Sequence, residues 1–301
     1  MVLSFFPKFA IAKIYTSRRV NQMNENTVSV ETRIDVKAIF RDKNPALARL
    51  IPNFIINYLR RVIHEDELND FMSKYGDLKN IDLVKAGLEY LGISYQVHNS
   101  QNIPGPGRYV FISNHPLGGL DGLVFMTEVS KHFNDIKFPV NDILLNISNM
   151  SGVFLPINKH GSQAREAAIK IEEAYASDEQ ILYFPAGLCS RKKHGQISDL
   201  EWQKNFLVKA IKHKRDIVPV YFSGKNSNWF YNLSNFRKSL GIKANIEMLY
   251  LPDEMFKQKD KDLHIVFGEI IPWETFDRSR TIIEWTGWLK GKSYELAEGI
   301  Q

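Results

Sequence analysis

The sequence predicts an α/β protein with a mixed, mostly parallel central sheet flanked by helices and an N-terminal helical extension. From residue 93 onward, short apolar runs of strand length alternate with stretches of helical spacing, an order typical of parallel α/β sheets. Before residue 93, apolar residues recur at helical spacing alone. We therefore expect two regions, a helical one over residues 1–92 and a main domain over residues 93–301.

Two helices are expected in the first region. Asn44 and Pro45 form a plausible N-cap and first helical position, and apolar residues then repeat at helical spacing to about residue 63. Pro52 should kink this helix or restart it. A second helix should span residues 81–91 and end at Gly92.

The main domain shows strands and helices in alternation. Strands are expected over 93–99, 108–113, 152–157, 180–185, 217–222 and 263–270, and helices over 119–133, 162–176, 199–213, 227–239 and 279–296. A turn is expected over 103–107, and a basic loop should follow residue 185. Pro219 lies inside a strand, which indicates an edge strand or a bulge.

Composition narrows the possible functions. Lys and Arg number 39 against 34 Asp and Glu, giving a net charge of +5, which fits an anionic surface or acidic ligands. Aromatic and basic residues are not interleaved as in RNA-binding modules, so we expect no nucleic-acid partner. Cys189 is the single cysteine; it excludes an internal disulfide and favours a reducing compartment. No motif predicts a metal.

The N-terminus and the apolar runs suggest a soluble or peripheral protein. The first residues lack the basic segment of a signal peptide, and Pro7 and Lys8 interrupt their apolar stretch. No uninterrupted apolar run is long enough to span a membrane. The helix over 45–63 is apolar on one face, so it either lies in a membrane interface or packs on the main domain.

The stretch SNHPLGGLDG, residues 113–122, is the strongest candidate for chemistry. His115 follows a buried strand, where open α/β sheets place their sites. Gly118 and Gly119 let the chain bend so that Asp121 can face the imidazole. A carboxylate on one ring nitrogen fixes the tautomer and suits the other to act as a general base. The alternative is that both residues serve a helix N-terminus.

In three further stretches, proline, glycine or charged residues lie within or directly after an expected strand. They are GVFLPINK (152–159), FPAGLCSR (184–191) and IVPVYF (217–222). Together with NHPLGGLD (114–121), this ordered set resembles the four motifs of the glycerolipid acyltransferases of the lysophosphatidic acid acyltransferase type. The resemblance covers residues 93–225 strongly and the C-terminal part loosely. The NHPLGGLDG and FPAGLCSR variants resemble a bacterial hemolysin-like subgroup associated with O-acylation of lyso-aminolipids.

The resemblance implies a mechanism and partners. His115 would deprotonate an acceptor hydroxyl that attacks an acyl thioester of acyl carrier protein or coenzyme A, and Asp121 would orient His115. No cofactor and no covalent enzyme intermediate would be needed, and backbone N–H groups near Gly187 or at the start of the following helix could hold the oxyanion. The protein would lie peripherally on the cytoplasmic face of the inner membrane. The remaining candidate substrate-binding residues are Asn114, Asn158, Lys159, Pro185, Gly187, Arg191 and Lys192.

Departures from the family pattern bear on the acceptor. His115 and Asp121 are separated by five residues instead of four, which the glycines could absorb. In the third motif Ala186, Leu188 and Cys189 replace Glu, Thr and Arg; the family associates that arginine with the acceptor phosphate. A lyso-aminolipid such as a glycine or ornithine lipid is therefore favoured. A phosphate acceptor, with Arg191 or its basic neighbours replacing the lost arginine, and a nonenzymatic lipid-binding or hemolysin-like protein remain as alternatives.

Overall fold

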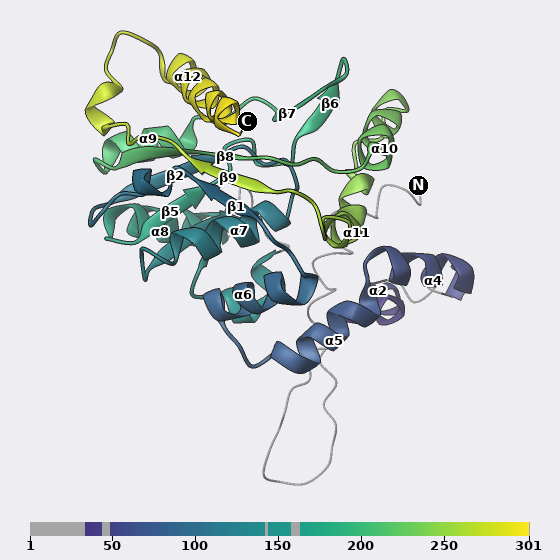
Figure 1. The fold of residues 1–301 in the computed structure, drawn as a ribbon. Coiled ribbons are helices and arrows are strands. Elements are labelled where there is room, and N and C mark those ends of the chain that lie inside the picture. The colour runs from purple at the N-terminus through teal and green to yellow at the C-terminus, as the bar shows by residue number, and fades with distance from the viewer. Residues whose placement is uncertain (1–33, 44–48, 142–143, 158–162, 301) are drawn as a thin grey trace, which may run out of the picture.

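A seven-stranded sheet forms the centre of the computed structural model, which describes residues 34–43, 49–141, 144–157 and 163–300 (Figure 1). The strand order is β1-β9-β8-β2-β5-β3-β4, with only the β8–β9 pair antiparallel among the described pairs. The mixed, mostly parallel sheet is therefore confirmed. The strands are β1 (Gln96–His98), β2 (Tyr109–Ser113), β3 (Ile136–Val140), β4 (Phe154–Pro156), β5 (Gln180–Tyr183), β8 (Asp216–Phe222) and β9 (His264–Phe267).

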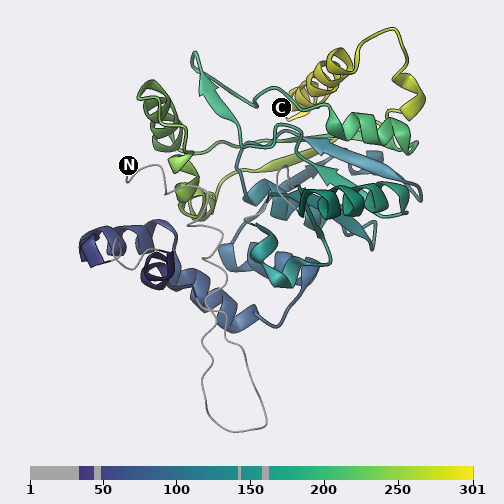
Figure 2. The ribbon, with the colours of Figure 1, turned by 180° about the vertical axis from the view of Figure 1, so that it is seen from behind.

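Helices cover both faces of the sheet (Figures 1 and 2). They are α2 (Val36–Lys43), α4 (Asn53–Val62), α5 (Glu65–Tyr75), α6 (Asn80–Leu91), α7 (Leu120–Val129), α8 (Gln163–Ala176), α9 (Asn205–Lys212), α10 (Asn228–Ser239), α11 (Leu251–Phe256) and α12 (Ile282–Glu295). Residues of α6 and α7 pack in one apolar core, and residues of α8, α9 and α12 pack in a second core.

Strand β2 shows why both faces are covered. Phe111 belongs to the core with α6 and α7, whereas Val110 and Ile112 belong to the core on the opposite face. All three are fully buried. A strand buried on both faces reads as a continuous apolar run, and this run was the clearest strand signal in the sequence.

The N-terminal region agrees in part with expectation. Helix α4 begins at Asn53 directly after Pro52, so the proline restarts the helix. Helix α6 ends at Gly92, which adopts φ 64° as its left-handed C-cap. The proposed cap at Asn44 and Pro45 lies outside the described residues. Helix α5 was missed because it is mostly polar, with three acidic residues in its first turn.

Three further elements correct the sequence-based expectations. Strand β3 was missed because Pro139 disguises it; this proline lies beyond the segment that pairs with β5, so no ladder hydrogen bond to β5 is lost. The expected basic loop contains an antiparallel hairpin, β6 (Arg191–Lys193) and β7 (Gln196–Ser198), turning at His194 and Gly195 with positive φ. Helix α11 is short, with Pro252 as its second residue, and it was also missed.

Pro219 lies in a central strand, so the expectation of an edge was wrong and that of a bulge was right. Val220 pairs with Phe267, but Ile217 pairs with Ile271, so three steps along β8 face four along the partner segment. Gly268 donates its N–H to the Pro219 carbonyl at 2.8 Å. A Cβ on Gly268 would lie 2.8 Å from Cγ of Pro219, so only glycine fits there.

Arg215 stabilises the junction between α8 and the sheet. Its side chain is fully buried, and it has no carboxylate partner among the described residues. Its guanidinium donates to five backbone carbonyls, those of Tyr109, Ala174, Tyr175, Ser177 and Glu179. Burial lowers the pKa of Arg215 to about 10, so the group stays protonated at neutral pH. It thus supplies both donors and positive charge at the C-terminus of α8.

Replacing Arg215 by Met should destabilise the fold by about 3 kcal/mol, because buried carbonyls would lose their donors. We expect the Tm to fall by roughly 5–10 °C in thermal unfolding. Lys243→Met, a change at an exposed lysine, is the matched control and should leave the Tm unchanged. An equal Tm for both variants would contradict this role.

Candidate active site

The candidate site begins where β2 ends. Asn114, directly after the strand, donates its amide to the Phe222 carbonyl at 2.8 Å and accepts the Phe222 N–H at 2.7 Å. This reciprocal pair ties the end of β2 to the end of β8 through a buried side chain. The next residue, His115, therefore leaves the sheet from a fixed point.

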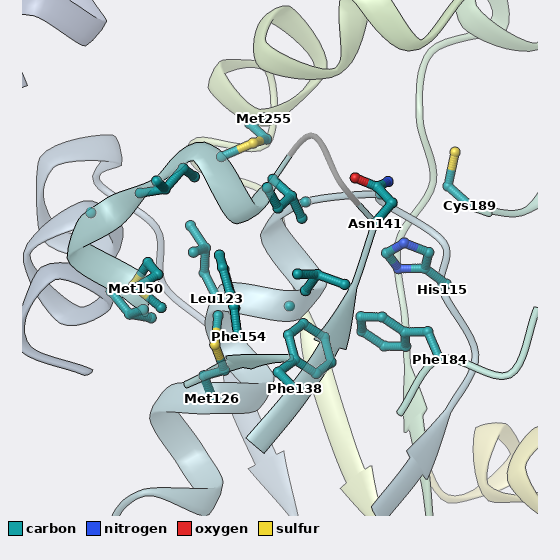
Figure 3. A pocket seen from close by; sticks show the side chains of 18 of the residues that line it. His115, Leu123, Met126, Phe138, Asn141, Met150, Phe154, Phe184, Cys189 and Met255 are labelled. Atoms are coloured by element: carbon teal, nitrogen blue, oxygen red, sulfur yellow. The ribbon is translucent and has the colours of Figure 1, made fainter. Parts of the chain in front are cut away.

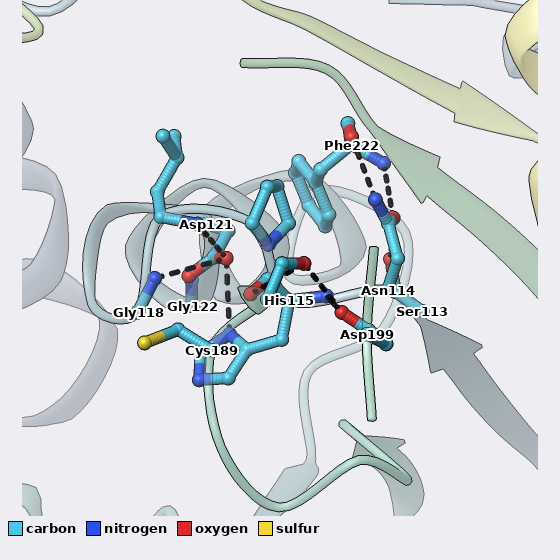
Figure 4. Close-up of polar contacts among 12 residues, drawn as sticks. Ser113, Asn114, His115, Gly118, Asp121, Gly122, Cys189, Asp199 and Phe222 are labelled. Atoms are coloured by element: carbon cyan, nitrogen blue, oxygen red, sulfur yellow. Dashed lines mark hydrogen bonds and ion pairs between the residues drawn. The ribbon is translucent and has the colours of Figure 1, made fainter. Parts of the chain in front are cut away.

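The predicted pair meets at hydrogen-bond distance. His115 Nδ1 lies 3.0 Å from Oδ2 of Asp121, which is in the first turn of α7 (Figure 4). Gly118 between them has φ +82°, and a Cβ there would lie 2.8 Å from the Leu251 side chain. The glycine thus permits the bend that the five-residue spacing requires.

Backbone donors hold the carboxylate in place. Asp121 Oδ2 also accepts the N–H groups of Leu117, at 2.9 Å, and Gly118, at 3.3 Å, while Oδ1 accepts that of Gly122 at 3.0 Å. The side chain is fully buried. These three N–H groups are therefore engaged, and Gly187 donates its own N–H to the Phe184 carbonyl at 3.0 Å.

Two further contacts hold His115, one to its ring and one to its backbone. The imidazole stacks on Phe184 with ring centroids 4.0 Å apart and an interplanar angle of 18°. Its backbone carbonyl accepts the Ser190 N–H at 2.7 Å. With Nδ1 facing Asp121, Nε2 is the ring nitrogen left for a substrate. The geometry suits a general base with its orienting carboxylate.

Asp199 is a part of the site that sequence reasoning missed. Its Oδ1 accepts from the His115 N–H at 3.2 Å and the Ser190 hydroxyl at 2.6 Å, and its Oδ2 accepts from Trp202 Nε1 at 2.9 Å. Its backbone N–H donates to the Tyr294 hydroxyl at 2.8 Å. The buried carboxylate thus positions the His115 backbone. A lone Asp outside the four motifs gave no sequence signal.

A large apolar cavity of about 680 Å³ reaches His115 (Figure 3). Its walls come from both regions of the chain, since α5 and α6 contribute together with α7, β3 and α11. Aromatic and methionine side chains dominate the part drawn in Figure 3, with Asn141 as a polar group beside His115. Among the described residues that line the cavity, none is Lys or Arg.

Only some of the other predicted site residues line the cavity. Pro185 and Gly187 line the cavity with His115. Asn114 does not, because its amide is used by the Phe222 backbone. Lys192 lies on the hairpin, where its ammonium donates to Asn228 at 3.2 Å. The remaining two, Asn158 and Lys159, lie outside the described residues.

Arg191 is buried and turned away from the cavity lining. Its guanidinium pairs with Glu247 at 3.1 Å and donates to the Cys189 carbonyl at 2.8 Å. Glu247 is fully buried and also pairs with Arg237. Through these contacts Arg191 acts as a brace for the Cys189–Ser190 segment.

Cys189 lines the cavity beside His115, but its thiol is poorly suited to attack. Burial raises the pKa of Cys189 to about 11, so the thiol is protonated at neutral pH and only the thiolate is strongly nucleophilic. A covalent acyl-cysteine step therefore has little support from this environment.

The described part of the chain offers neither a cluster of metal ligands nor a membrane-spanning helix. No group of three or more His, Cys, Asp or Glu side chains there could hold a metal ion. None of the helices there is both long and apolar enough to cross a bilayer.

Comparisons with known proteins identify the class of this site. The profile of the family described as Acyltransferase matches residues 38–301, so the chain belongs to that acyltransferase family and is an enzyme of that class. Two relatives carry the name lyso-glycine lipid O-acyltransferase. One from Bacteroides thetaiotaomicron is 45% identical over 87% of this chain and 97% of its own length; one from Phocaeicola vulgatus is 41% identical over 93% and 99%.

A solved structure is also similar. The 1-acyl-sn-glycerophosphate (LPA) acyltransferase PlsC from Thermotoga maritima matches with a TM-score of 0.45 and 16% identity, over 72% of this chain and 77% of that one.

Replacing Asp121 by Asn should lower kcat by about 1000-fold, because the amide cannot hold the tautomer that leaves Nε2 unprotonated. Release of free thiol from an acyl thioester measures the rate. Asp77→Asn, at an exposed position, is the matched control. A folded Asp121→Asn variant with near-normal kcat would contradict the assigned role.

Cys189→Ala should retain most of the transfer rate, because the thiol is protonated and no step requires it. Steady-state kinetics and mass spectrometry of the protein during turnover check this. Loss of transfer together with an acyl adduct on Cys189 of the unmodified protein would instead favour covalent catalysis.

Proposed function

We propose that this enzyme transfers a fatty acyl group from an acyl thioester of acyl carrier protein or coenzyme A to the hydroxyl of a lyso-aminolipid, with lyso-glycine lipid as the first candidate. The observation that carries the proposal is the pair of His115 and Asp121 at 3.0 Å, beside a large apolar cavity. The names of the two bacterial relatives support the acceptor class.

The proposed reaction needs one proton shuttle. His115 Nε2 accepts the hydroxyl proton as the acceptor oxygen attacks the thioester carbonyl, and a C–O bond forms. Asp121 stabilises the imidazolium through Nδ1. Collapse of the tetrahedral intermediate breaks the C–S bond, and the leaving thiolate takes the proton from Nε2. The products are an ester and a free thiol.

The cavity fits the lipid part of the substrates. Its volume of about 680 Å³ is within the range of ligand sites, and its lining is mostly apolar. An acyl chain buried there gains stabilisation in proportion to the apolar area removed from water. His115 lines the same cavity, so a thioester carbonyl at the end of a buried chain would lie close to the base.

The polar side chains that line the cavity favour an amide-bearing acceptor over a phosphate monoester. Gln203 and Asn205 line the cavity together with Asn141, and neutral amides can hydrogen-bond an acceptor amide. A phosphate dianion calls for cationic donors. Among the described residues, Arg191 touches the cavity-lining Cys189, but it is already paired with buried Glu247. The phosphatidic acid-forming alternative therefore has weaker support.

Acceptor competition tests the proposal. Purified protein is incubated with acyl carrier protein thioester, or with acyl-coenzyme A, and one of lyso-glycine lipid, lyso-ornithine lipid or lysophosphatidic acid. Ester formation should be fastest with a lyso-aminolipid. Acylation of lysophosphatidic acid alone would overturn the acceptor assignment and favour the alternative.

His115→Ala should abolish ester formation while leaving vesicle binding unchanged, because the imidazole is the base and only the chemical step needs it. Radiolabelled acyl transfer and vesicle co-sedimentation measure the two properties. His132→Ala, a change at an exposed histidine, is the matched control. Full retention of cellular lipid effects by His115→Ala would favour a nonenzymatic, hemolysin-like role.

A further inference from the structure

Exposed apolar side chains gather on two helices that are distant in sequence. Among the described residues, ten large hydrophobic side chains are exposed, and six of them lie in α4, in α10, just before α4 or just after α10. The other four lie singly, with Ile169, Val208 and Ile283 on different helices and Ile270 after β9. Single exposed apolar residues need no explanation, but a cluster marks an interaction site.

Helix α10 is apolar on two faces. Phe230 and Tyr231 are buried against the protein. The outward face carries Trp229, 55% exposed, Phe236, 61% exposed, and Leu240, 59% exposed, just past the end of the helix. Their spacing places them on one side of the helix. Within the described part of the chain, these three side chains stay largely exposed.

Helix α4 presents a similar face. Phe54 is 72% exposed and Tyr58 45%, and their four-residue spacing puts them on one side of the helix. Leu50, 78% exposed, adds a third apolar side chain just before the break at Pro52. The inward side of this helix buries Ile56 and Val62. Both helices therefore carry an outward apolar row in addition to their packed side.

Tyr250 joins the two rows. Its hydroxyl lies 2.8 Å from the Tyr58 hydroxyl, and its ring meets Trp229 edge to face with centroids 6.1 Å apart. Helix α11, which follows Tyr250, lies between α4 and α10 in both views (Figures 1 and 2). We call the surface formed by Leu50, Phe54, Tyr58, Tyr250, Trp229, Phe236 and Leu240 the apolar ledge.

The two helices of the ledge carry basic but no acidic side chains. Asp253 of α11, close to Tyr250, is paired with His64 and Lys257. Arg49 and Arg61 are exposed near one row, and Lys238 and Lys243 are exposed near the other. Aromatic and aliphatic side chains flanked by cations are the arrangement that inserts into the headgroup region of an anionic bilayer.

We propose that the apolar ledge docks the enzyme on an anionic lipid bilayer, with α10 inserting alongside α4. The ledge also adjoins the cavity, because Met248 on one side of Tyr250 and Pro252 and Met255 on the other line its wall. Docking in this orientation brings the cavity wall to the lipid surface, where an acceptor with an acyl chain resides. The docking surface itself does not depend on which headgroup the acceptor carries.

Co-sedimentation of the full-length protein with vesicles tests the ledge. The vesicles are phosphatidylglycerol mixed with phosphatidylethanolamine, compared with phosphatidylcholine alone. The double change Phe236→Ser with Leu240→Ser should weaken partitioning into the anionic vesicles by about tenfold or more. Leu50→Ser with Phe54→Ser should do the same. The matched control, Ile169→Ser with Ile283→Ser, should bind like the original protein.

Two further measurements make the test specific. Brominated phosphatidylglycerol should quench tryptophan fluorescence of the original protein more than that of Trp229→Phe. Lys238→Glu with Lys243→Glu should weaken binding to anionic vesicles and leave the weaker binding to phosphatidylcholine unchanged. Transfer to a detergent-dispersed acceptor should stay normal in the α10 variants, so failure of docking and failure of the acyl-transfer proposal are distinguishable.

Several results would overturn the proposal. Normal vesicle binding by the α10 variants would exclude α10 from the contact. A dimer of the original protein that dissociates in these variants, with vesicle binding unchanged, would make the ledge an interface between two copies. Selective loss of acyl carrier protein binding, again with normal vesicle binding, would make it a protein-docking surface.

Discussion

The buried carboxylate of Asp121 is the interaction on which the site depends. It accepts hydrogen bonds from one ring nitrogen of His115 and from three backbone N–H groups. The carboxylate and the bend between β2 and α7 therefore hold each other in place. A buried carboxylate without such donors would be costly. Because the bend is built around the charge, the orientation of His115 is set before any substrate arrives, which is the condition for efficient general-base catalysis.

The helical region is a structural part of the candidate site. Helix α6 packs in the main core through Leu83, Val84 and Leu88, and α5 and α6 form one wall of the cavity. The shape of the cavity is therefore set jointly by the first hundred residues and by the sheet. Changes in α5 or α6, far from His115 in sequence, can therefore alter the shape of the cavity.

The elements that have strong apolar patterns could be predicted from the sequence, and the structure shows why the other elements could not. The buried run of β2 and the cap at Gly92 carry unambiguous signals. Strand β3 was missed because it contains Pro139. The proline is tolerated because β3 pairs with β5 only through residues 136–137 and with β4 from residue 138 onward, which only the fold shows. His115 and Asp121 were found because they are only six positions apart and so fall within one short motif. Asp199 was missed because its contact with His115 spans 84 positions, and no local pattern encodes such a pairing.

The pairing of β1 with β9 has a consequence for synthesis of the protein. The rings of His98 and His264 form a hydrogen bond across these strands, although the two residues are 166 positions apart. Asp199, which holds the His115 backbone, is itself hydrogen-bonded to Tyr294 near the C-terminus. During translation, the first strand of the sheet must wait for its neighbour to leave the ribosome. The contact that holds Asp199 can therefore form only after Tyr294 in α12 has been synthesised.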